Sequence, residues 1–190
     1  LTERGSLRIL IGLPFNFVPG KYAALILEKT KGKKAKRKYK LLSVNRKVFP
    51  VAYVNFTPEK RKLIGSPLNK RETELIAGAI KVEHKKQNWE KEFILPVEGR
   101  LVGEYGAKRM AGEEFLWSHK GVDLKAPEST PVLSANSGEV ILAEKGFYLH
   151  GKTVMIDHGQ GVSTIYLHLK AIDVELSLIH ISEPTRQAEI

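Results

Sequence analysis

Short apolar runs separated by turn residues fill the first part of the chain and indicate β-strands. Each run is bounded by proline, glycine or a lysine-rich stretch, which is the pattern of strands joined by turns. The predicted strands are residues 8–13, 21–29, 38–45 and 49–56. We therefore predict a small, mainly β domain over residues 1–60.

The hydrophobic period changes after this region. Leu75, Ile76, Ala79 and Ile80 recur at helical spacing and are surrounded by charged residues. This pattern is typical of an amphipathic helix with one apolar face. We predict that the helix lies within 69–87 and belongs to a helical linker over residues 61–92.

From residue 93 the pattern is again that of strands. Three apolar runs are punctuated by the turn sequences "NSG" and "HGQG". These strands are predicted at residues 138–144, 152–158 and 162–169. The fold class that follows is mainly β, with an N-terminal β-domain, a linking helix and an antiparallel β-sheet or sandwich over residues 93–175.

The composition restricts the chemistry that this chain can carry. It is 42% hydrophobic, as expected of a globular protein, and no apolar run reaches the roughly 18 residues of a membrane span. There are no cysteines, so disulfides, thiolate zinc sites and cysteine nucleophiles are excluded. Any metal site must therefore use histidine, aspartate or glutamate.

The positive charge is concentrated in one segment, residues 29–40. This segment carries eight positive charges and no negative charge. The net charge of the whole chain is +10, and without this segment it would be only +2. We expect it to project into solvent at a hairpin tip and to attract polyanions such as anionic envelope polymers. Its residues assigned to polyanion binding are Lys33, Lys34, Lys36, Arg37 and Lys38. Nucleic acid is not expected as a partner, because Tyr39 is the only aromatic residue among these charges.

The stretch "SHKGVDLKAP" places His119 and Asp123 four residues apart with Gly121 between them. In a straight strand these side chains would be about 13 Å apart. A zinc ion needs both ligand atoms about 2 Å away, so the backbone would have to bend, which glycine permits. On spacing alone, a surface histidine with a capping aspartate is the more common explanation.

The other histidines favour less specific roles. His84 is expected to be a solvated residue of the helix, His150 a turn residue, and His158 a turn-stabilising residue. His168 ends a strand in which it shares one face with Thr164 and Tyr166. Three polar side chains on one face suggest a wet groove, although a half-exposed sheet face is an equally good explanation.

Three ordered motifs together resemble the lysostaphin/LytM-type zinc metallopeptidases, which cut peptide cross-links of peptidoglycan. They are "HKGVDLKAP", "TPVLSANSGEVILAE" and "GKTVMIDHGQGVSTIYLHL", within a resemblance that runs from about Phe93 to Val174. The "PGKY" turn and the β-region around it resemble the non-catalytic domain found before the peptidase in periplasmic members. The resemblance implies one Zn²⁺, peptidoglycan stem peptides as substrate, and a periplasmic or extracellular location at the cell envelope.

The resemblance also implies roles for individual residues. His119 and Asp123 would be two of three zinc ligands, His168 the catalytic histidine, and Tyr166 a substrate-binding residue. The family's later His-x-His pair, which supplies the third ligand and a catalytic partner, is absent from these 190 residues. The chain as it stands is therefore expected to be inactive. The family's glycine in the turn before "TPV" is replaced by Ser129, which we take as a minor departure.

The last residues, 176–190, depart from the family. The sequence "LSLIHISEPTR" resembles a translated adaptor, so we predict that this tail is not native to the fold and makes few contacts with it. His180 is not expected to replace the missing ligand.

Two other functions are compatible with parts of the sequence. A catalytically dead peptidase-like module could bind the cell wall or an envelope partner, and the missing His-x-His pair favours this alternative. A lipoyl- or biotinyl-carrier domain would present a modifiable lysine at a hairpin tip, and Lys145 is the only candidate there. If the chain were such a carrier domain, the four-residue spacing of His119 and Asp123 would be a coincidence.

Overall fold

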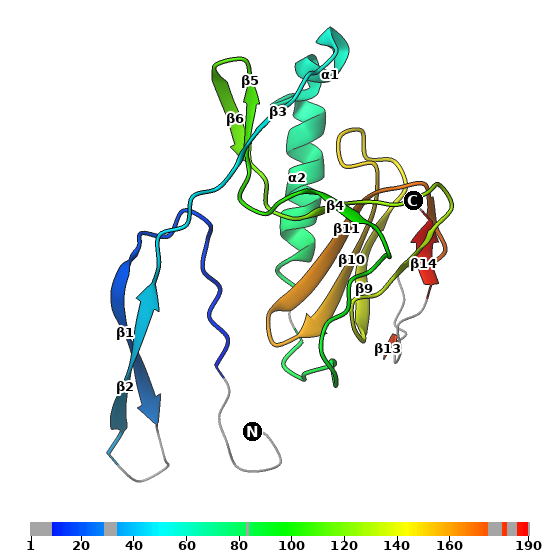
Figure 1. Cartoon of the computed structure of the whole chain (residues 1–190). Coiled ribbons are helices and arrows are strands. Elements are labelled where there is room, and N and C mark those ends of the chain that lie inside the picture. Colours follow the sequence, from blue (N-terminus) through cyan, green and yellow to red (C-terminus); the bar gives the residue numbers. More distant parts are fainter. Residues whose placement is uncertain (1–8, 29–33, 83, 175–179, 182–185, 190) are drawn as a thin grey trace. The chain divides into compact units, whose positions relative to one another are not determined.

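This computed structural model describes residues 9–28, 34–82, 84–174, 180–181 and 186–189. These residues form mainly strands with two short helices, which confirms the predicted fold class (Figure 1). The chain divides into two compact units. Unit 1 comprises residues 1–53 and 104–121, and unit 2 comprises residues 54–103 and 122–190.

This division differs from the predicted boundaries. The two helices belong to unit 2 with the later strands, rather than forming a linker of their own. Residues 104–121 group with the N-terminal strands instead of with the predicted peptidase-like domain. The domain boundaries proposed from the sequence stay a prediction.

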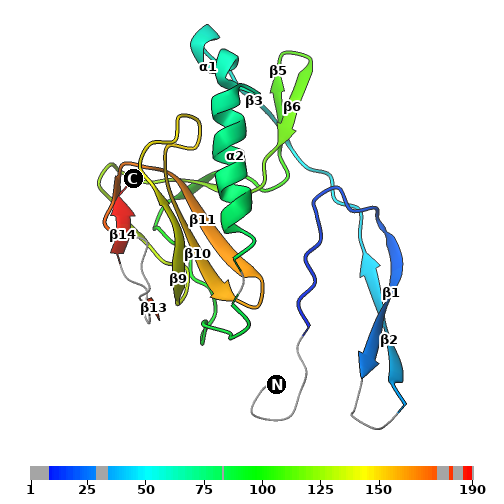
Figure 2. The same ribbon diagram turned by 180° about the vertical axis from the view of Figure 1, so that it is seen from behind.

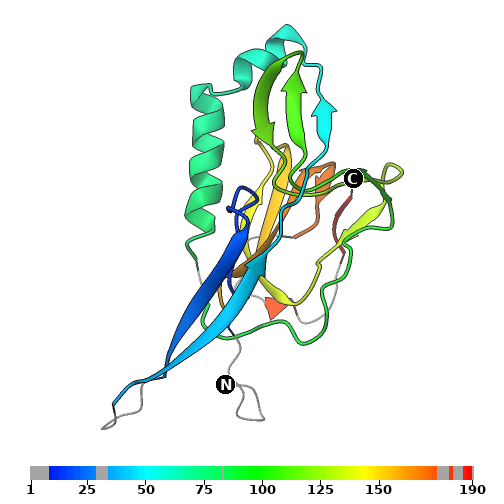
Figure 3. The same ribbon diagram turned by 60° about the vertical axis from the view of Figure 1, so that its left-hand side comes forward.

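Unit 1 contains two small sheets. Strands β1 (Gly20–Glu28) and β2 (Lys36–Val44) form an antiparallel hairpin. Strands β3 (Val51–Tyr53), β5 (Lys108–Ala111) and β6 (Glu114–Ser118) lie side by side in a second sheet, with β3 parallel to β5 (Figure 3). The strand predicted at 8–13 is wrong for its described residues, 9–13, which form no strand. Gly12 and the following Pro14 weaken strand formation there, and these residues pair with no strand in the described part of the chain.

Unit 2 is built on strands β9 (Gly138–Glu144), β10 (Lys152–Gly159) and β11 (Val162–Leu169), which pair antiparallel (Figure 1). The predicted bounds of β9 and β11 agree with the structure, and β10 extends one residue beyond its prediction. Short strands surround this sheet. They are β4 (Arg100–Gly103), β7 (Asp123–Lys125), β8 (Pro131–Leu133) and β12 (Ala171–Ile172).

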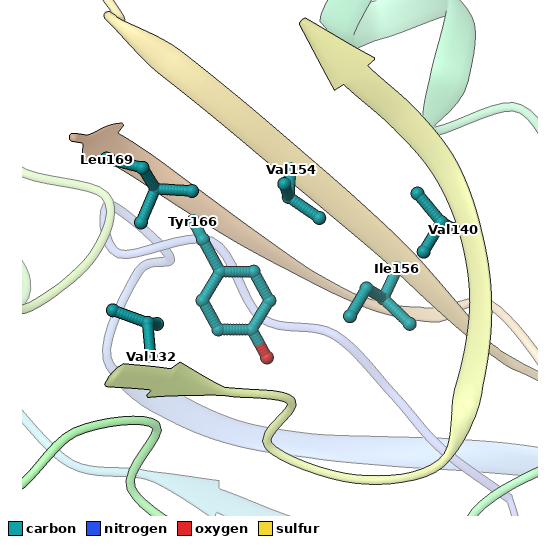
Figure 4. Packing of buried hydrophobic residues seen from close by; sticks show 6 residues of the cluster. All are labelled: Val132, Val140, Val154, Ile156, Tyr166 and Leu169. Carbon is teal, nitrogen blue, oxygen red and sulfur yellow. The ribbon is translucent and has the colours of Figure 1, made fainter. Parts of the chain in front are cut away.

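Strand β10 is buried on both faces, because each face packs against a different cluster. Val154 and Ile156 meet Tyr166, Val140, Val132 and Leu169 on one face (Figure 4). Met155 packs on the other face with Leu142 and Ala79. Val140 and Leu142 would share a face in a regular strand, but a register shift between Met155 and Ile156 sends them to opposite faces.

The two helices of unit 2 begin at matching signals. Helix α1 (Pro58–Leu63) is capped by Thr57, and helix α2 (Pro67–Ala79) is capped by Ser66, whose hydroxyl accepts the N–H of Asn69. Through Ala79, α2 packs on the face of the sheet that carries Met155 (Figure 2).

Helix α2 ends eight residues before the predicted limit of 87. The backbone beyond it bonds to the end of β10 instead: His84 accepts the N–H of Gln160, and Asn88 donates to the carbonyl of His158. Because these backbone groups form hydrogen bonds with the strand end, they cannot form the i to i−4 hydrogen bonds that would extend the helix.

The prediction that the tail makes few contacts with the β-domain is wrong for its described residues. Strand β13 (His180–Ile181) pairs with β9, and β14 (Arg186–Glu189) pairs with both β8 and β12. Strand edges offer unpaired N–H and C=O groups to any extended segment, whatever its side chains. Backbone pairing therefore brings this segment onto the sheets despite its polar sequence.

Ser129 occupies a strained position in the turn that leads to β8. Its φ of 66° lies in the left-handed region. The N–H of Thr130 donates to the carbonyl of Pro127 at 3.2 Å, so Ser129 is the third residue of a β-turn. A positive φ at this position is that of a type II turn, where glycine is preferred. A glycine would adopt this φ without strain.

Replacing Ser129 by glycine is therefore expected to raise the free energy of unfolding by about 1 kcal/mol, because the left-handed penalty is removed. Urea denaturation measures the change. Ser163→Gly, at an exposed position of β11, is the matched control and should lower stability by about 0.5–1 kcal/mol. Equal effects of the two substitutions would contradict the strain at Ser129.

Candidate functional site

His119 is held by a turn of unit 1. Its backbone N–H donates to Ala107 at 2.8 Å, and its carbonyl accepts from Gly106 at 2.7 Å. Gly106 has a φ of 80°, and a Cβ there would lie 2.2 Å from the ring of Phe49, so only glycine fits. The motif "EYGAKR" thus supplies the turn on which the histidine rests.

The ring of His119 is oriented as in many metal-binding histidines. Its Nδ1 lies 3.0 Å from the carbonyl oxygen of Glu104, which can only accept, so Nδ1 is the donor of this hydrogen bond and Nε2 is left for another partner. Metal-bound imidazoles commonly donate their second nitrogen to a backbone carbonyl in this way. The residue type and the ring orientation of His119 are therefore those of a zinc ligand.

Asp123 begins β7 in unit 2, beside Gly103 of β4. The chain bends at Gly121, as expected, but Gly121 is not among the glycines with positive φ. Since His119 and Asp123 belong to different units, their sharing of one metal ion stays a prediction. Within the part of the chain that the structure describes, no group of three histidine, aspartate or glutamate side chains could hold a metal.

His168 is displaced from the regular pattern of β11 by a bulge. Val154 pairs with Tyr166, but Lys152 pairs with Leu169, so two residues of β11 stand opposite Thr153. His168 has a φ of 59°, a left-handed conformation that is uncommon outside glycine. Tyr166 and Leu169 are buried, whereas His168 is exposed. The bulge therefore turns the imidazole out of the sheet, as bulges beside active sites often do.

The surroundings of His168 lower the pKa of its imidazole. Partial desolvation is the largest cause, the neighbouring His150 and Lys60 act in the same direction, and the carboxylate of Asp123 opposes them. The ring is therefore mainly neutral at pH 7 and able to accept a proton.

The prediction that Thr164, Tyr166 and His168 share one wet face is wrong, because the bulge intervenes. Tyr166 is only 9% exposed and belongs to the core cluster of Figure 4. Its hydroxyl accepts the N–H of Ala135 at 2.7 Å and lies 3.0 Å from the hydroxyl of Thr164. These contacts give Tyr166 a structural role, and its binding of substrate stays a prediction.

The interpretation of His84 as a solvated residue is wrong. Its Nδ1 lies 2.6 Å from the buried carboxylate of Asp157, which also accepts its backbone N–H at 3.0 Å. Its Nε2 lies 3.3 Å from Glu139. These carboxylates, with the hydrogen bond to Asp157 as the main cause, raise the pKa of His84. Its partners lie more than 50 residues away, so local periodicity could not identify them.

His158 and His150 are both more engaged than expected of turn residues. His158 is fully buried, donates from Nδ1 to the carbonyl of Ser137 at 2.6 Å, and has a pKa lowered mainly by burial. His150 pairs with Glu72 of α2 through Nδ1 at 2.7 Å. No repeating pattern links Glu72 to this loop, and sequence reasoning missed it.

The predicted polyanion-binding residues lie around the start of β2. Lys34, Lys36, Arg37 and Lys38 are exposed, and Lys33 lies outside the described residues. Lys38 pairs with Glu28 at 3.2 Å across the hairpin, with both side chains largely exposed. Such exposed pairs are worth at most about 1 kcal/mol, so Lys38 remains available to other anions.

Comparison with known proteins shows that this chain is similar to M23 peptidases in fold and, over part of its length, in sequence. A solved structure from Pseudomonas aeruginosa, assigned to peptidase M23, superimposes with a TM-score of 0.66 and 25% identity, covering 94% of this chain and 64% of that one. Residues 117–178, which contain His119, Asp123 and His168, match Peptidase family M23.

Three curated relatives are similar in sequence to shorter stretches of this chain. Cell division protein DipM of Caulobacter vibrioides is 31% identical over 84 residues, which are 44% of this chain and 13% of that protein. DD-carboxypeptidase/endopeptidase Mpg of Neisseria meningitidis is 44% identical over 54 residues, 28% of this chain and 12% of that protein. The uncharacterized lipoprotein YgeR of Escherichia coli is 26% identical over 76 residues, 40% of this chain and 28% of that protein. The matched residues therefore span less than a third of the length of each of these relatives.

Neither helix in the described part of the chain is long and apolar enough to cross a membrane.

Proposed function

We propose that this chain is part of a zinc-dependent endopeptidase that hydrolyses peptide cross-links of bacterial peptidoglycan. The observation that carries the proposal is the match of residues 117–178, a stretch that contains His119, Asp123 and His168, to Peptidase family M23. The similarity to Mpg, a DD-carboxypeptidase/endopeptidase, supports this substrate class. The corresponding location is the periplasm or the cell exterior, at the envelope.

The proposed roles follow from the chemistry of each side chain. His119 and Asp123 would hold the zinc ion through an imidazole Nε2 and a carboxylate, both suitable zinc donors. Zinc, when bound, lowers the pKa of a coordinated water and polarises the scissile carbonyl. His168, exposed and mainly neutral, accepts a proton from the attacking water and returns it to the leaving amine.

A third zinc ligand is needed, and in this proposal it lies outside the 190 residues. Two protein ligands leave the site incomplete, because catalytic zinc normally has three. The 190-residue chain should accordingly bind zinc weakly and cleave little. The same chain continued by its native downstream coding sequence should be active.

The test compares both forms on cross-linked muropeptides, with and without a zinc chelator. Cleavage by the continued form, lost with chelator and restored by zinc, is the expected result. Full activity of the 190-residue form would refute the missing-ligand proposal. Binding of peptidoglycan without cleavage by either form would favour the docking module, for which the absent His-x-His pair is the supporting observation.

The basic hairpin is proposed to bind anionic envelope polymers. Replacing Lys34, Lys36 and Lys38 by glutamine should weaken binding to a polyphosphate-bearing wall polymer severalfold at low salt, because the attraction is electrostatic and screened over about 8 Å at physiological salt. Cosedimentation at two salt concentrations measures this. Replacing Lys81, Lys85 and Lys86, exposed lysines of unit 2, removes the same charge and is the control. Equal weakening by both triple variants would show a net-charge effect and refute a specific site.

A further inference from the structure

Glu72 of helix α2 is a buried carboxylate that the proposed reaction does not use. It is 5% exposed and accepts hydrogen bonds from the backbone N–H groups of Tyr148, Leu149 and His150. It also accepts from the His150 ring, whose Nδ1 lies 2.7 Å from its Oε2. A buried charge is costly unless it is paired, and here three amides and an imidazole surround it.

These contacts keep Glu72 ionised. Burial alone would raise its pKa, but the hydrogen bonds from the His150 ring and from the three amides outweigh burial and lower the pKa. Because an ionised carboxylate only accepts, the Nδ1 of the His150 ring is the donor in this contact. Glu72 therefore fixes the backbone and the ring orientation of the 148–150 segment together.

The same segment holds the backbone of His168. The N–H of His168 donates to the carbonyl of His150 at 2.9 Å. Gly151, with a φ of 63°, approaches so closely that a Cβ there would lie 3.1 Å from the Cα of His168. A single loop thus connects the buried carboxylate of α2 with the bulge of β11.

His168 needs such support because its conformation is unfavourable. A left-handed φ costs a non-glycine residue about 1–2 kcal/mol, and it persists only where surrounding contacts determine it. Its neighbour along the bulge, Leu167, is also exposed, so core packing alone does not fix this turn. The hydrogen bond to His150 and the close approach of Gly151 are the contacts that do.

We propose that Glu72 and His150 are positioning residues, which hold His168 in its left-handed, outward-facing conformation through the 148–151 loop. The inference rests on the proposed function only in calling His168 catalytic, because the placement of its backbone is a property of this chain. Neither Glu72 nor His150 is assigned any contact with substrate.

Amide hydrogen exchange in the 190-residue chain, measured by NMR, tests this placement. Glu72→Gln should accelerate exchange of the His168 amide about ten- to a hundredfold, as expected for the loss of a charge-assisted network. The amide of Ile156 in the core should change by less, and the His168 Cα shift should move. Glu74→Gln, the same change at an exposed site on the same helix, is the control and should alter neither.

Equal acceleration at His168 and Ile156 would mean that Glu72 only supports global stability and would overturn the inference, as would an unchanged His168 amide. If Glu72→Gln does not fold, His150→Asn takes its place, with the same comparison of the two amides. In the active continued form, Glu72→Gln should lower kcat with little change in KM. Should His168→Asn retain full activity, the catalytic role fails, and the exchange result still decides the positioning role.

Discussion

Replacing His168 by asparagine is expected to lower the rate of cross-link hydrolysis by about 10²–10⁴-fold in the chain continued by its downstream sequence. This is the range by which a general acid–base group accelerates such reactions. Asparagine is chosen because it tolerates a left-handed backbone, whereas alanine would add strain at the φ of 59°. The rate is measured on purified cross-linked muropeptides.

Two controls separate chemistry from folding in this prediction. The melting temperature of His168→Asn should stay close to that of the wild type, because the exposed imidazole contributes little to the core. His84→Asn, which breaks the contact with Asp157, should lower stability and leave the rate of the folded protein nearly unchanged. A loss of less than tenfold for His168→Asn would remove His168 from the reaction.

Replacing Ile156 by alanine is expected to lower the free energy of unfolding by about 2–5 kcal/mol, the range for truncating a fully buried aliphatic side chain. Ile156 has no exposed surface and packs with Val140, Val154 and Tyr166 in the cluster of Figure 4. The loss combines less apolar burial with a cavity that the paired strands cannot close. Urea denaturation of unit 2, followed by tryptophan fluorescence, measures it.

The matched control for this prediction is Ile165→Ala on the neighbouring strand β11. Ile165 is 40% exposed, so its truncation should cost about 1 kcal/mol. If both isoleucines cost the same, the assignment of the core to the face carrying Ile156 would be wrong.

The sequence predicted the central strands well because their apolar runs were strong and their turns clear. "GEVILAE" and "VSTIYLHL" became β9 and β11 with the predicted bounds. The end of α2 and the pairing of the tail were not predictable in this way. Both depend on backbone groups competing for the ends and edges of strands far away in sequence.

The sequence predicted which residues belong to the candidate site, but it did not predict the contacts that surround them. The resemblance assigned a role to His168, and that role stays a prediction. The alternation of β11 placed His168 on the face of Tyr166, because a bulge cannot be recognised from a period of two. Glu72 and His84 were missed for a related reason. Their partners, His150 and Asp157, are joined to them only by the folded chain.

Zinc binding by the continued chain tests the proposed site most directly, and it is measured as stoichiometry and affinity for the wild type, His119→Ala and Asp123→Ala. We expect one zinc ion per chain and a loss of affinity of at least about a hundredfold in either variant, because even outer contacts of a zinc site are worth about 10–100-fold. Each variant should keep its fold by circular dichroism. Zinc bound equally well by all three proteins, or by none of them, would contradict the assignment of His119 and Asp123 as ligands.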